Sequence, residues 1–341
     1  MSDAGHVLAP TPSAPPARTA GAPTVSVVVC AYTLDRWDDL VAGLAALRHQ
    51  TRPPLEVLLV VDHAPDLLAR ARTGLAPGVT VLENVFERGL SGARNSGAAV
   101  AGGDVLLFLD DDARPDPDWV EAGTAAFADP AVVGTGGTAV PAWDAPGRPA
   151  WFPESFLWVV GCSYEGLPGD GAPLRNPIGA SMGFRRADLL AAGGFTSGIG
   201  RVGRHPVGCE ETELSIRVRQ RRGGAARIVL TGEAVVHHRV RTDRATVGYF
   251  LRRCFWEGFS KAVVAAAVGS EDALSSERSY ATQVLPHAVV RGIRSTATGG
   301  GAAGVQQAAA VVVGFGTTAA GYAYGLLARR SRVAGTGVRR G

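Results

Sequence analysis

The sequence predicts an α/β fold, with a doubly wound and mostly parallel sheet followed by a helical C-terminal region. Three observations support this prediction. Short apolar runs alternate with segments of helical periodicity between residues 24 and 140. Two of these runs end directly in aspartate, at Asp62 and at Asp110. Near the C-terminus, residues 305–328 contain no charged side chain.

The alternation of strands and helices is clearest in the first 120 residues. Residues 25–30, VSVVVC, form a continuous run rich in β-branched side chains, which is typical of a strand covered on both faces. Residues 57–61 and 105–109 are similar runs, and residues 38–49 and 91–101 have helical character. This alternation indicates parallel pairing. Ligands of such sheets bind beyond the carboxyl ends of the strands, where the two aspartates lie.

The pattern changes after about residue 140. Residues 143–177 are rich in Pro, Gly and Trp and predict an irregular segment. Helical spacing returns at residues 211–222, and residues 227–230 and 234–240 predict two further strands. The second half of the domain is therefore expected to be less regular than the first.

These patterns divide the chain into three regions. Residues 1–23, rich in Pro, Ala, Ser and Thr, predict a disordered tail. Residues 24–245 form the predicted α/β domain, and residues 246–341 form the helical region. Residues 305–328 are long enough to span a bilayer. Their many Gly, Ala and Thr residues lower the apolar density, so a spanning helix, an interfacial helix and a buried helix all remain open.

Charge and composition exclude several classes of protein. The formal net charge is only +3, which does not indicate a nucleic-acid-binding protein. Basic residues concentrate after Arg239, which favours contact with a membrane surface or with phosphate groups. Lys261 is the only lysine, and its position excludes a P-loop. The four cysteines have no zinc-binding spacing and are expected to be reduced thiols.

Three adjacent carboxylates, Asp110, Asp111 and Asp112, follow a buried apolar run. Like charges held this close repel one another unless a cation neutralises them. Asp110 and Asp112 project from the same side of an extended strand end, and hard oxygen ligands suit Mg²⁺ or Mn²⁺. The sequence therefore predicts a divalent metal site here. The alternative is a solvated acidic turn.

Three segments together resemble the family 2 glycosyltransferases, which have the GT-A fold. They are VSVVVCAYTLDR at residues 25–36, NVFERGLSGARNSGAAVAGGDVLLFLDDDARPDPDWV at residues 84–120 and CEETELSIRVRQRRG at residues 209–223. The resemblance covers roughly residues 24–240. It implies a metal-dependent enzyme that moves a sugar, with inversion, from a nucleotide-sugar donor, expected to be UDP-linked, to an acceptor hydroxyl. The metal would neutralise charge on the departing diphosphate.

A shorter segment, RCFWEGFSKA at residues 253–262, resembles a subgroup that acts on polyprenyl-phosphate-linked acceptors. This resemblance implies a lipid-linked glycan, or another cell-envelope glycan, as the acceptor. Arg252 and Arg253 lie beside Phe255 and Trp256, an arrangement suited to holding a lipid phosphate at a membrane interface. The alternative for both arginines is a solvated basic helix face.

The resemblance also assigns the residues that bind the donor. They are Ala31, Tyr32, Asp35, Asp62, Gly89, Arg94, Asn95, Asp110 and Asp111. Asp62 is expected to accept a hydrogen bond from the uracil imide, although His63-Ala64-Pro65 depart from the family's usual loop and leave the base open. The alternatives are that Asp62 caps the following helix and that Gly89, Arg94 and Asn95 form an ordinary helix start.

The general base is expected at Glu210-Glu211, where the family has a Glu-Asp pair. Inverting transfer needs a carboxylate that deprotonates the attacking hydroxyl, and Glu211 takes that place with a side chain one methylene longer. Glu210 and Glu213 are the substitutes. The alternative is that these acids only offset the dipole of the helix that begins there.

Two further assignments follow from the resemblance. His238, on the same strand face as Val236 and Val240, is expected to be a metal ligand beside Asp110 and Asp112. Met182 and Gly183 are expected to line the acceptor side. The alternatives are a hydrogen-bonded histidine and a plain core strand, respectively.

Two other functions share part of this pattern. A nucleotidyltransferase would carry a Gly-rich basic loop after the first strand, and residues 31–35 contain none. A non-catalytic protein that binds a nucleotide-sugar or a lipid would keep the metal site without transfer. The replacement of aspartate by Glu211 leaves this second alternative open.

The location of the protein is predicted from residues 305–328 and from the arginines that follow them. If the segment spans a membrane, Arg329 and Arg330 favour a cytoplasmic C-terminus. The catalytic domain would then face away from cytosolic nucleotide-sugars. We therefore expect a hairpin or a membrane-surface helix, with the catalytic domain on the cytoplasmic side, either peripheral or held by the C-terminal segment.

Overall fold

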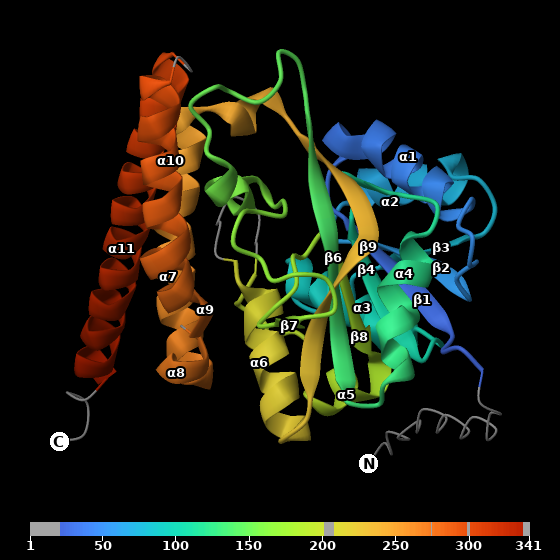
Figure 1. The fold of residues 1–341 in the computed structure, drawn as a ribbon. Coiled ribbons are helices and arrows are strands. Elements are labelled where there is room, and N and C mark those ends of the chain that lie inside the picture. Colours follow the sequence, from blue (N-terminus) through green and yellow to red (C-terminus); the bar gives the residue numbers. More distant parts are fainter. Residues whose placement is uncertain (1–20, 201–207, 274, 299–300, 337–341) are drawn as a thin grey trace.

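The computed structural model describes residues 21–200, 208–273, 275–298 and 301–336. Most of the tail predicted to be disordered, residues 1–20, lies outside these ranges. Figure 1 shows a central sheet with helices on its faces and a layer of C-terminal helices along one side. The predicted α/β class with a helical C-terminal region is confirmed.

The sheet has nine strands in the order β3-β2-β1-β4-β8-β6-β9-β5, with β7 paired to β9. The strands that pair in parallel at one side are β1 (Val25–Ala31), β2 (Glu56–Val61), β3 (Val79–Glu83) and β4 (Val105–Asp110). The remaining strands are β5 (Ala113–Pro115), β6 (Val132–Trp143), β7 (Pro173–Leu174), β8 (Ser181–Arg185) and β9 (Arg227–Val240). Among these, β6 and β9 are parallel, whereas β8 is antiparallel to β4 and β6, and β5 and β7 are antiparallel to β9. The parallel order is therefore continuous in the first four strands and mixed beyond them.

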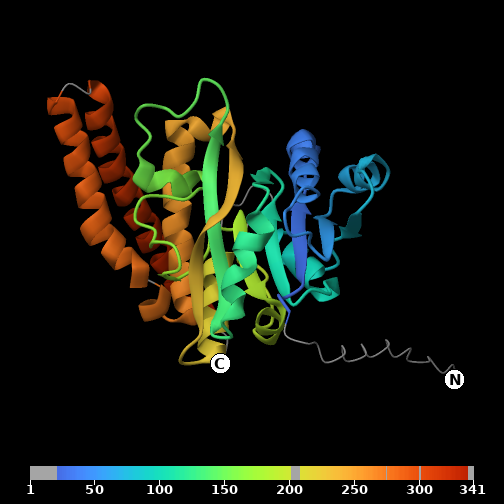
Figure 2. The same ribbon diagram turned by 45° about the vertical axis from the view of Figure 1, so that its right-hand side comes forward.

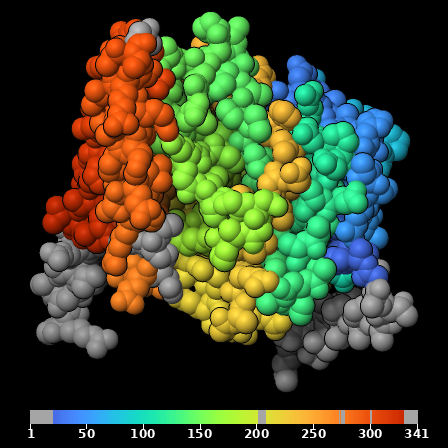
Figure 3. All heavy atoms as spheres, in the orientation of Figure 1, coloured from blue at the N-terminus to red at the C-terminus, as the bar shows by residue number. Residues whose placement is uncertain are grey.

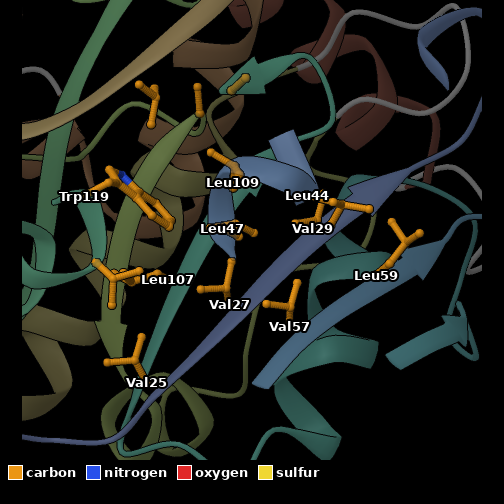
Figure 4. Packing of buried hydrophobic residues seen from close by; sticks show 14 of the residues in the cluster. Val25, Val27, Val29, Leu44, Leu47, Val57, Leu59, Leu107, Leu109 and Trp119 are labelled. Atoms are coloured by element: carbon orange, nitrogen blue, oxygen red, sulfur yellow. The ribbon is translucent and has the colours of Figure 1, made fainter. Parts of the chain in front are cut away.

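Both faces of the parallel half are covered by helices. Val25, Val27 and Val29 of β1 point to one face, and Val28 points to the other. The first face packs on α1 (Trp37–Leu47), α2 (Pro65–Gly74) and α4 (Trp119–Ala125), and Figure 4 shows Leu44, Leu47 and Trp119 in this layer. The second face packs on α3 (Leu90–Val100), α5 (Arg186–Ala191) and α6 (Glu210–Arg222). Burial on both sides explains the uninterrupted apolar run.

The long strands β6 and β9 lie between the parallel half and the C-terminal helices (Figure 2). β9 is one strand of 14 residues, where the sequence predicted two shorter ones. A register shift against β6 between Gly136 and Thr138 accommodates the break in its pattern. The segment predicted to be irregular, residues 143–177, begins at the end of β6 and contains a short 3₁₀ helix, Glu154–Val160.

The C-terminal layer is built on an aromatic core and on close contacts between helices. Its long helices are α7 (Val247–Val268), α10 (Leu285–Ala297) and α11 (Ala302–Thr336), and two short ones, α8 (Ser270–Ala273) and α9 (Ser275–Ser279), join them. Phe152, Phe156 and Phe250 pack between the 3₁₀ helix and α7 with ring centroids 5.3–5.5 Å apart. Figure 3 shows this layer, in orange and red, along one side of the molecule.

Within the described residues, one helical segment, Ala302–Ala328, is long and apolar enough to cross a membrane. An 18-residue stretch of this segment has a mean hydropathy of 1.4, and only 22% of that stretch is buried inside the protein. α11 is therefore not an ordinary core helix. Gly321 of α11 faces α7, and a Cβ there would overlap the carbonyl oxygen of Phe255. Gly316 of the same helix has no neighbour within 4 Å of its Cβ position.

These two glycines test the packing of the C-terminal layer. Alanine at Gly316 is expected to stabilise the helix by about 1 kcal/mol, because alanine has the higher helix propensity. Alanine at Gly321 is expected to destabilise the protein by about 1–3 kcal/mol, because the added methyl must push α11 away from α7. Thermal unfolding of Gly321→Ala and Gly316→Ala measures both effects. Equal unfolding temperatures for the two variants would contradict this packing.

Candidate active site

A cavity of about 470 Å³ opens where the carboxyl ends of the first strands face the C-terminal helices. Its wall on the sheet side includes Ala31, Asp62 and Asp110, and its wall on the helical side includes Lys261 and Tyr280. The position agrees with the general rule for open α/β sheets. The cavity therefore joins the strand ends and the C-terminal layer in one space.

Asp110, Asp112 and His238 lie together, but only Asp110 lines this cavity, whereas Asp112 and His238 are buried and do not form part of its wall. One ligand atom from each lies within 4.8 Å of the others. The antiparallel pairing of β5 with β9 places His238 opposite Ala113, which follows Asp112 directly in the chain. His238 Nε2 is 3.1 Å from an Asp112 carboxylate oxygen and 4.0 Å from one of Asp110. Sheet pairing thus brings Asp110 and His238, which are 128 positions apart in the sequence, into one cluster.

Protons and arginines balance the charge of these buried carboxylates. Arg36 and Arg244 each place a guanidinium nitrogen 3.2 Å from Asp112. Burial would raise the pKa of Asp112, but the charges of His238, Arg36 and Arg244 hold it below its usual range. Burial alone would lower the pKa of His238, but the Asp112 carboxylate outweighs this effect and raises it to about 10. These three positive groups therefore keep Asp112 ionised and balance its charge.

The residues of the cluster fit a divalent metal ion. Two carboxylates and one imidazole are a ligand set that Mn²⁺ and related ions accept. Burial raises the pKa of the neighbouring Asp111 to about 7 despite its ion pair with Arg36. One Asp111 carboxylate oxygen is buried without a hydrogen-bond partner among the described residues. A divalent cation would relieve this accumulation of acidic groups.

Asp62 organises the loop that precedes α3 at the wall of the cavity. Its carboxylate accepts hydrogen bonds from the Asn84 side chain at 2.7 Å and from the Gly89 backbone at 3.0 Å. Gly89 precedes α3 with φ of 131°, a conformation that favours glycine. Asp62 also contacts His63 Nδ1 at 2.9 Å, and it does not cap α2, whose N-cap is Ala64.

Arg94 links the metal cluster to the acidic pair at the start of α6. It is 2% exposed, lies on α3 and lines the cavity. Its guanidinium is 2.9 Å from Glu210 and 3.4 Å from Asp110. Glu210 is therefore committed to an ion pair. Glu211 lines the cavity and makes no ion pair or side-chain hydrogen bond with the described residues.

Not all the residues predicted for the site line the cavity. Ala31, Tyr32, Asp62, Arg94, Asp110, Asp111, Glu210, Glu211 and Arg253 do so. Met182 and Gly183 lie in β8 within the core, where Gly183 packs against Thr135 and Leu107. Glu213 pairs with Arg217 at 2.7 Å, and Asn95 holds the backbone of Phe195 with two hydrogen bonds of 2.8 Å.

Three more predicted residues lie outside the cavity wall. Asp35 belongs to the short 3₁₀ turn Leu34–Arg36 that Thr33 caps. Gly89 acts through its backbone contact with Asp62. Arg252 is exposed and lies 5.6 Å from the ring centroid of Tyr249. The positions of Asp35, Gly89 and Arg252 therefore give no direct support to the ligand contacts predicted for these residues.

Sequence reasoning missed several residues of the site. Arg36 and Arg244 lie on short 3₁₀ turns, and nothing in their local sequence shows that they turn back to Asp112. Cys162 Sγ is 3.7 Å from His238 Nδ1, on the other side of the ring from Asp112. A partner at Nδ1 fixes the ring orientation of a metal-binding histidine. The sequence signal for Cys162 was only a solitary cysteine.

Comparisons with known proteins agree with this geometry. Residues 26–190 match the model of glycosyl transferase family 2. The glucosyl-dolichyl phosphate glucuronosyltransferase of Haloferax volcanii is 33% identical over 306 residues, which cover 89% of this chain and 96% of that protein. An uncharacterized glycosyltransferase of Haemophilus influenzae is 36% identical over 88 residues, 26% of this chain and 29% of that protein.

A solved structure shows the same fold. The mannosyltransferase PcManGT from Pyrobaculum calidifontis, in complex with GDP-Man and Mn²⁺, superimposes with a TM-score of 0.53 at 19% identity and covers 86% of each chain. The fold and the Asp110–Asp112–His238 cluster define a GT-A-type glycosyltransferase with a metal site. The chain belongs to glycosyltransferase family 2. This result favours a glycosyltransferase over the nucleotidyltransferase and the non-catalytic binding protein.

Proton release tests the metal cluster. Because the Asp112 carboxylate raises the pKa of His238 to about 10, the imidazole is protonated at neutral pH. A metal ion must therefore displace that proton to bind Nε2. We expect the affinity for Mn²⁺ to rise between pH 6 and pH 9, with about one proton released per ion. Calorimetry in buffers of different ionisation enthalpy measures this number.

A neighbouring histidine provides the matched control. His237 lies on the opposite face of β9, where its Nε2 is 3.1 Å from Asp116. We expect His238→Gln to lower the affinity for Mn²⁺ and to remove the proton release, and His237→Gln to leave both unchanged. Equal effects of the two substitutions would mean that His238 is not a ligand.

Proposed function

We propose that this enzyme transfers a sugar, with inversion, from a UDP-linked donor to a hydroxyl of a polyprenyl-phosphate-linked or other cell-envelope glycan. One observation carries the proposal: a single cavity contains Asp62, Asp110, the carboxylate of Glu211 and the wall of C-terminal helices. The donor and the acceptor hydroxyl would meet at Glu211. The name of the Haloferax relative, which specifies a glucosyl-dolichyl phosphate, supports a lipid-linked acceptor.

The donor would occupy the sheet side of the cavity. The exposed ring of Tyr32 and the carboxylate of Asp62 would contact the base. A carboxylate has about four acceptor positions, so Asp62 keeps room for a base N–H beside its contacts with Asn84, Gly89 and His63. This capacity supports UDP, whose uracil offers an imide N–H.

The metal, Mn²⁺ or Mg²⁺, would be held by Asp110, Asp112 and His238. When bound, it would supply positive charge beside the diphosphate of the donor, where negative charge develops as the sugar leaves. Arg36, which contacts both Asp111 and Asp112, would also stabilise the negative charge of the diphosphate. We propose Mn²⁺ as the more suitable ion because the ligand set includes an imidazole.

Glu211 would act as the general base. Burial, with a further contribution from the charge of Glu210, raises its pKa to about 8. The carboxylate would accept the proton of the acceptor hydroxyl while that oxygen forms a bond to the anomeric carbon. The bond from the anomeric carbon to the diphosphate oxygen breaks, and nucleoside diphosphate leaves with the electron pair. The Arg94–Glu210 pair would position this end of α6.

The exposed side of α11 would contact a lipid surface. Val312, Val313, Phe315 and Leu327 are all between 48% and 60% exposed on this helix. A helix with such a face lies on or in a membrane more readily than in water. We propose a location at the cytoplasmic side of the membrane, where nucleotide-sugars are available and where a lipid-linked acceptor reaches the cavity.

Replacement of Glu211 tests the assignment of the base. Transfer by Glu211→Gln is expected to fall by about 10²- to 10⁴-fold, while the affinity for the nucleotide-sugar stays the same. Because only the deprotonated carboxylate accepts a proton, kcat/KM of the natural enzyme should rise with pH and level off above about pH 8. Glu213→Gln, on the same helix but outside the cavity, is the control. Normal transfer by Glu211→Gln would refute the assignment.

A further inference from the structure

Helix α10 has three distinct sides, and it lies with α11 at the outer edge of the molecule (Figure 2). Its buried side consists of Leu285, Ala288 and Gly292. A second stripe at helical spacing is exposed and apolar, and it consists of Pro286, Val290, Ile293 and Ala297. A third stripe, next to the second, is exposed and polar, and it consists of His287, Arg291 and Arg294. An exposed apolar side beside a basic side is typical of a helix that lies in a membrane interface.

The exposed side of α11 continues this apolar surface. It includes Val305, Ala309, Val312, Val313, Ala320 and Ala323, and residues 305–328 contain no charged side chain. The two helices are in close contact, because a Cβ at Gly292 of α10 would meet Gly304 and Ala308 of α11. We therefore treat the exposed apolar sides of α10 and α11 as one unit, which we call the outer face.

The charge of this part of the chain indicates what covers the outer face. Residues 278–341 contain eight arginines and no aspartate or glutamate. Arg291 is 58% exposed although it pairs with Glu165, so its charge is accessible from the surface. A second copy of the chain would bring the same positive charge to the contact and would be repelled. A bilayer with anionic headgroups offers both the apolar interior and the opposite charge.

The packing of α11 on α7 decides between a spanning and an in-plane position. Gly314 lies against the Phe250 ring, and a Cβ at Gly258 would overlap the backbone of Thr318. These contacts fall near the middle of the apolar segment Ala302–Ala328. The part of α7 between them carries Arg252, Arg253 and Glu257. If α11 stood upright across a bilayer, these charged side chains would lie near its centre, where they are costly.

We propose that α10 and α11 lie parallel to the plane of an anionic membrane and insert the outer face into one leaflet. The arginines of α10 then lie at the level of the lipid headgroups. This inference rests on the proposed function, in which α11 contacts a lipid surface. It deepens that contact in three respects: α10 takes part, the position is in-plane and not spanning, and the anionic headgroup is the chemistry that the helices recognise.

Binding of the full-length protein to preformed vesicles tests the charge of the contact. We expect tighter binding to phosphatidylcholine vesicles that contain phosphatidylglycerol than to vesicles of phosphatidylcholine alone. Arg294→Gln should weaken binding to the anionic vesicles by about fivefold and leave the weaker binding to neutral vesicles unchanged. Arg72→Gln is the control, because Arg72 is exposed on α2, on the opposite side of the molecule (Figure 1).

The apolar stripe of α10 has its own matched pair of variants. Ile293→Gln should weaken binding to both kinds of vesicle by about tenfold, because this side chain would no longer gain from burial in the leaflet. Leu55→Gln should leave binding unchanged. Leu55 is 58% exposed and Ile293 is 54% exposed, but Leu55 lies just before β2, away from the C-terminal layer.

Spin labels on α11 test its orientation in the membrane. Val305→Cys, Val312→Cys and Ala323→Cys each place a label on the exposed side of the helix. The native thiols are buried or half-buried, so the introduced cysteine reacts first. The in-plane position predicts the same depth for all three labels. A spanning helix would place the label at position 312 deeper than the one at position 305 by about 10 Å.

Three results would overturn the proposal. They are a deeper label at position 312, equal binding to anionic and neutral vesicles, and a dimer that binds neither, which would mean that a second copy covers the outer face. Mn²⁺-dependent binding of the nucleotide-sugar, measured on the same variants without vesicles, reports on the proposed function separately. Intact donor binding beside any of the three results would refute the membrane contact alone.

Discussion

The negative charge of the buried carboxylates at the end of β4 is the constraint on which the site depends. Asp112 is buried and needs cations around it, and these come from three separate elements: Arg36 after β1, His238 on β9 and Arg244 after β9. The central strand β4 can end in this way only because β9 pairs with β5 and returns His238 to it. The same arrangement suits a divalent ion, because an ion bound there can supply the positive charge that the proton of His238 and the nearby guanidinium groups supply in its absence.

The C-terminal layer is part of this active site and is attached directly to it. Ser260 of α7 accepts a hydrogen bond from the backbone of Gly208 at 3.0 Å, and the Cys209 thiol contacts Glu257 at 3.4 Å. Both contacts lie immediately before Glu210 and Glu211. α7, which supplies part of the cavity wall, therefore also supports the start of α6. A lipid-linked acceptor bound against α7 would lie beside the proposed base, which joins membrane contact to chemistry in one structural unit.

The sequence predicted the parallel half of the fold well, because strands buried on both faces leave uninterrupted apolar runs such as residues 25–30. The burial of His238 followed from its alternation with Val236 and Val240, and all three are buried in β9. The sequence did not predict β6, since Gly134, Gly136 and Pro141 weaken its strand pattern. It also did not predict Arg36 and Arg244 beside Asp112, because tertiary folding alone brings them there. Resemblance placed Met182 and Gly183 near the acceptor, but they point to opposite faces of β8 and both faces are filled by core packing there.

The central claim is that the carboxylates after β4 hold a metal ion that in turn holds a nucleotide-sugar. Calorimetry of UDP-glucose, GDP-mannose and dTDP-glucose, each with and without Mn²⁺, tests it most directly when repeated with Asp112→Ala. We expect UDP-glucose to bind only when Mn²⁺ is present and this binding to be lost in Asp112→Ala. Nucleotide-sugar binding that depends on neither Mn²⁺ nor Asp112 would contradict the account and would leave the three aspartates as a structural turn.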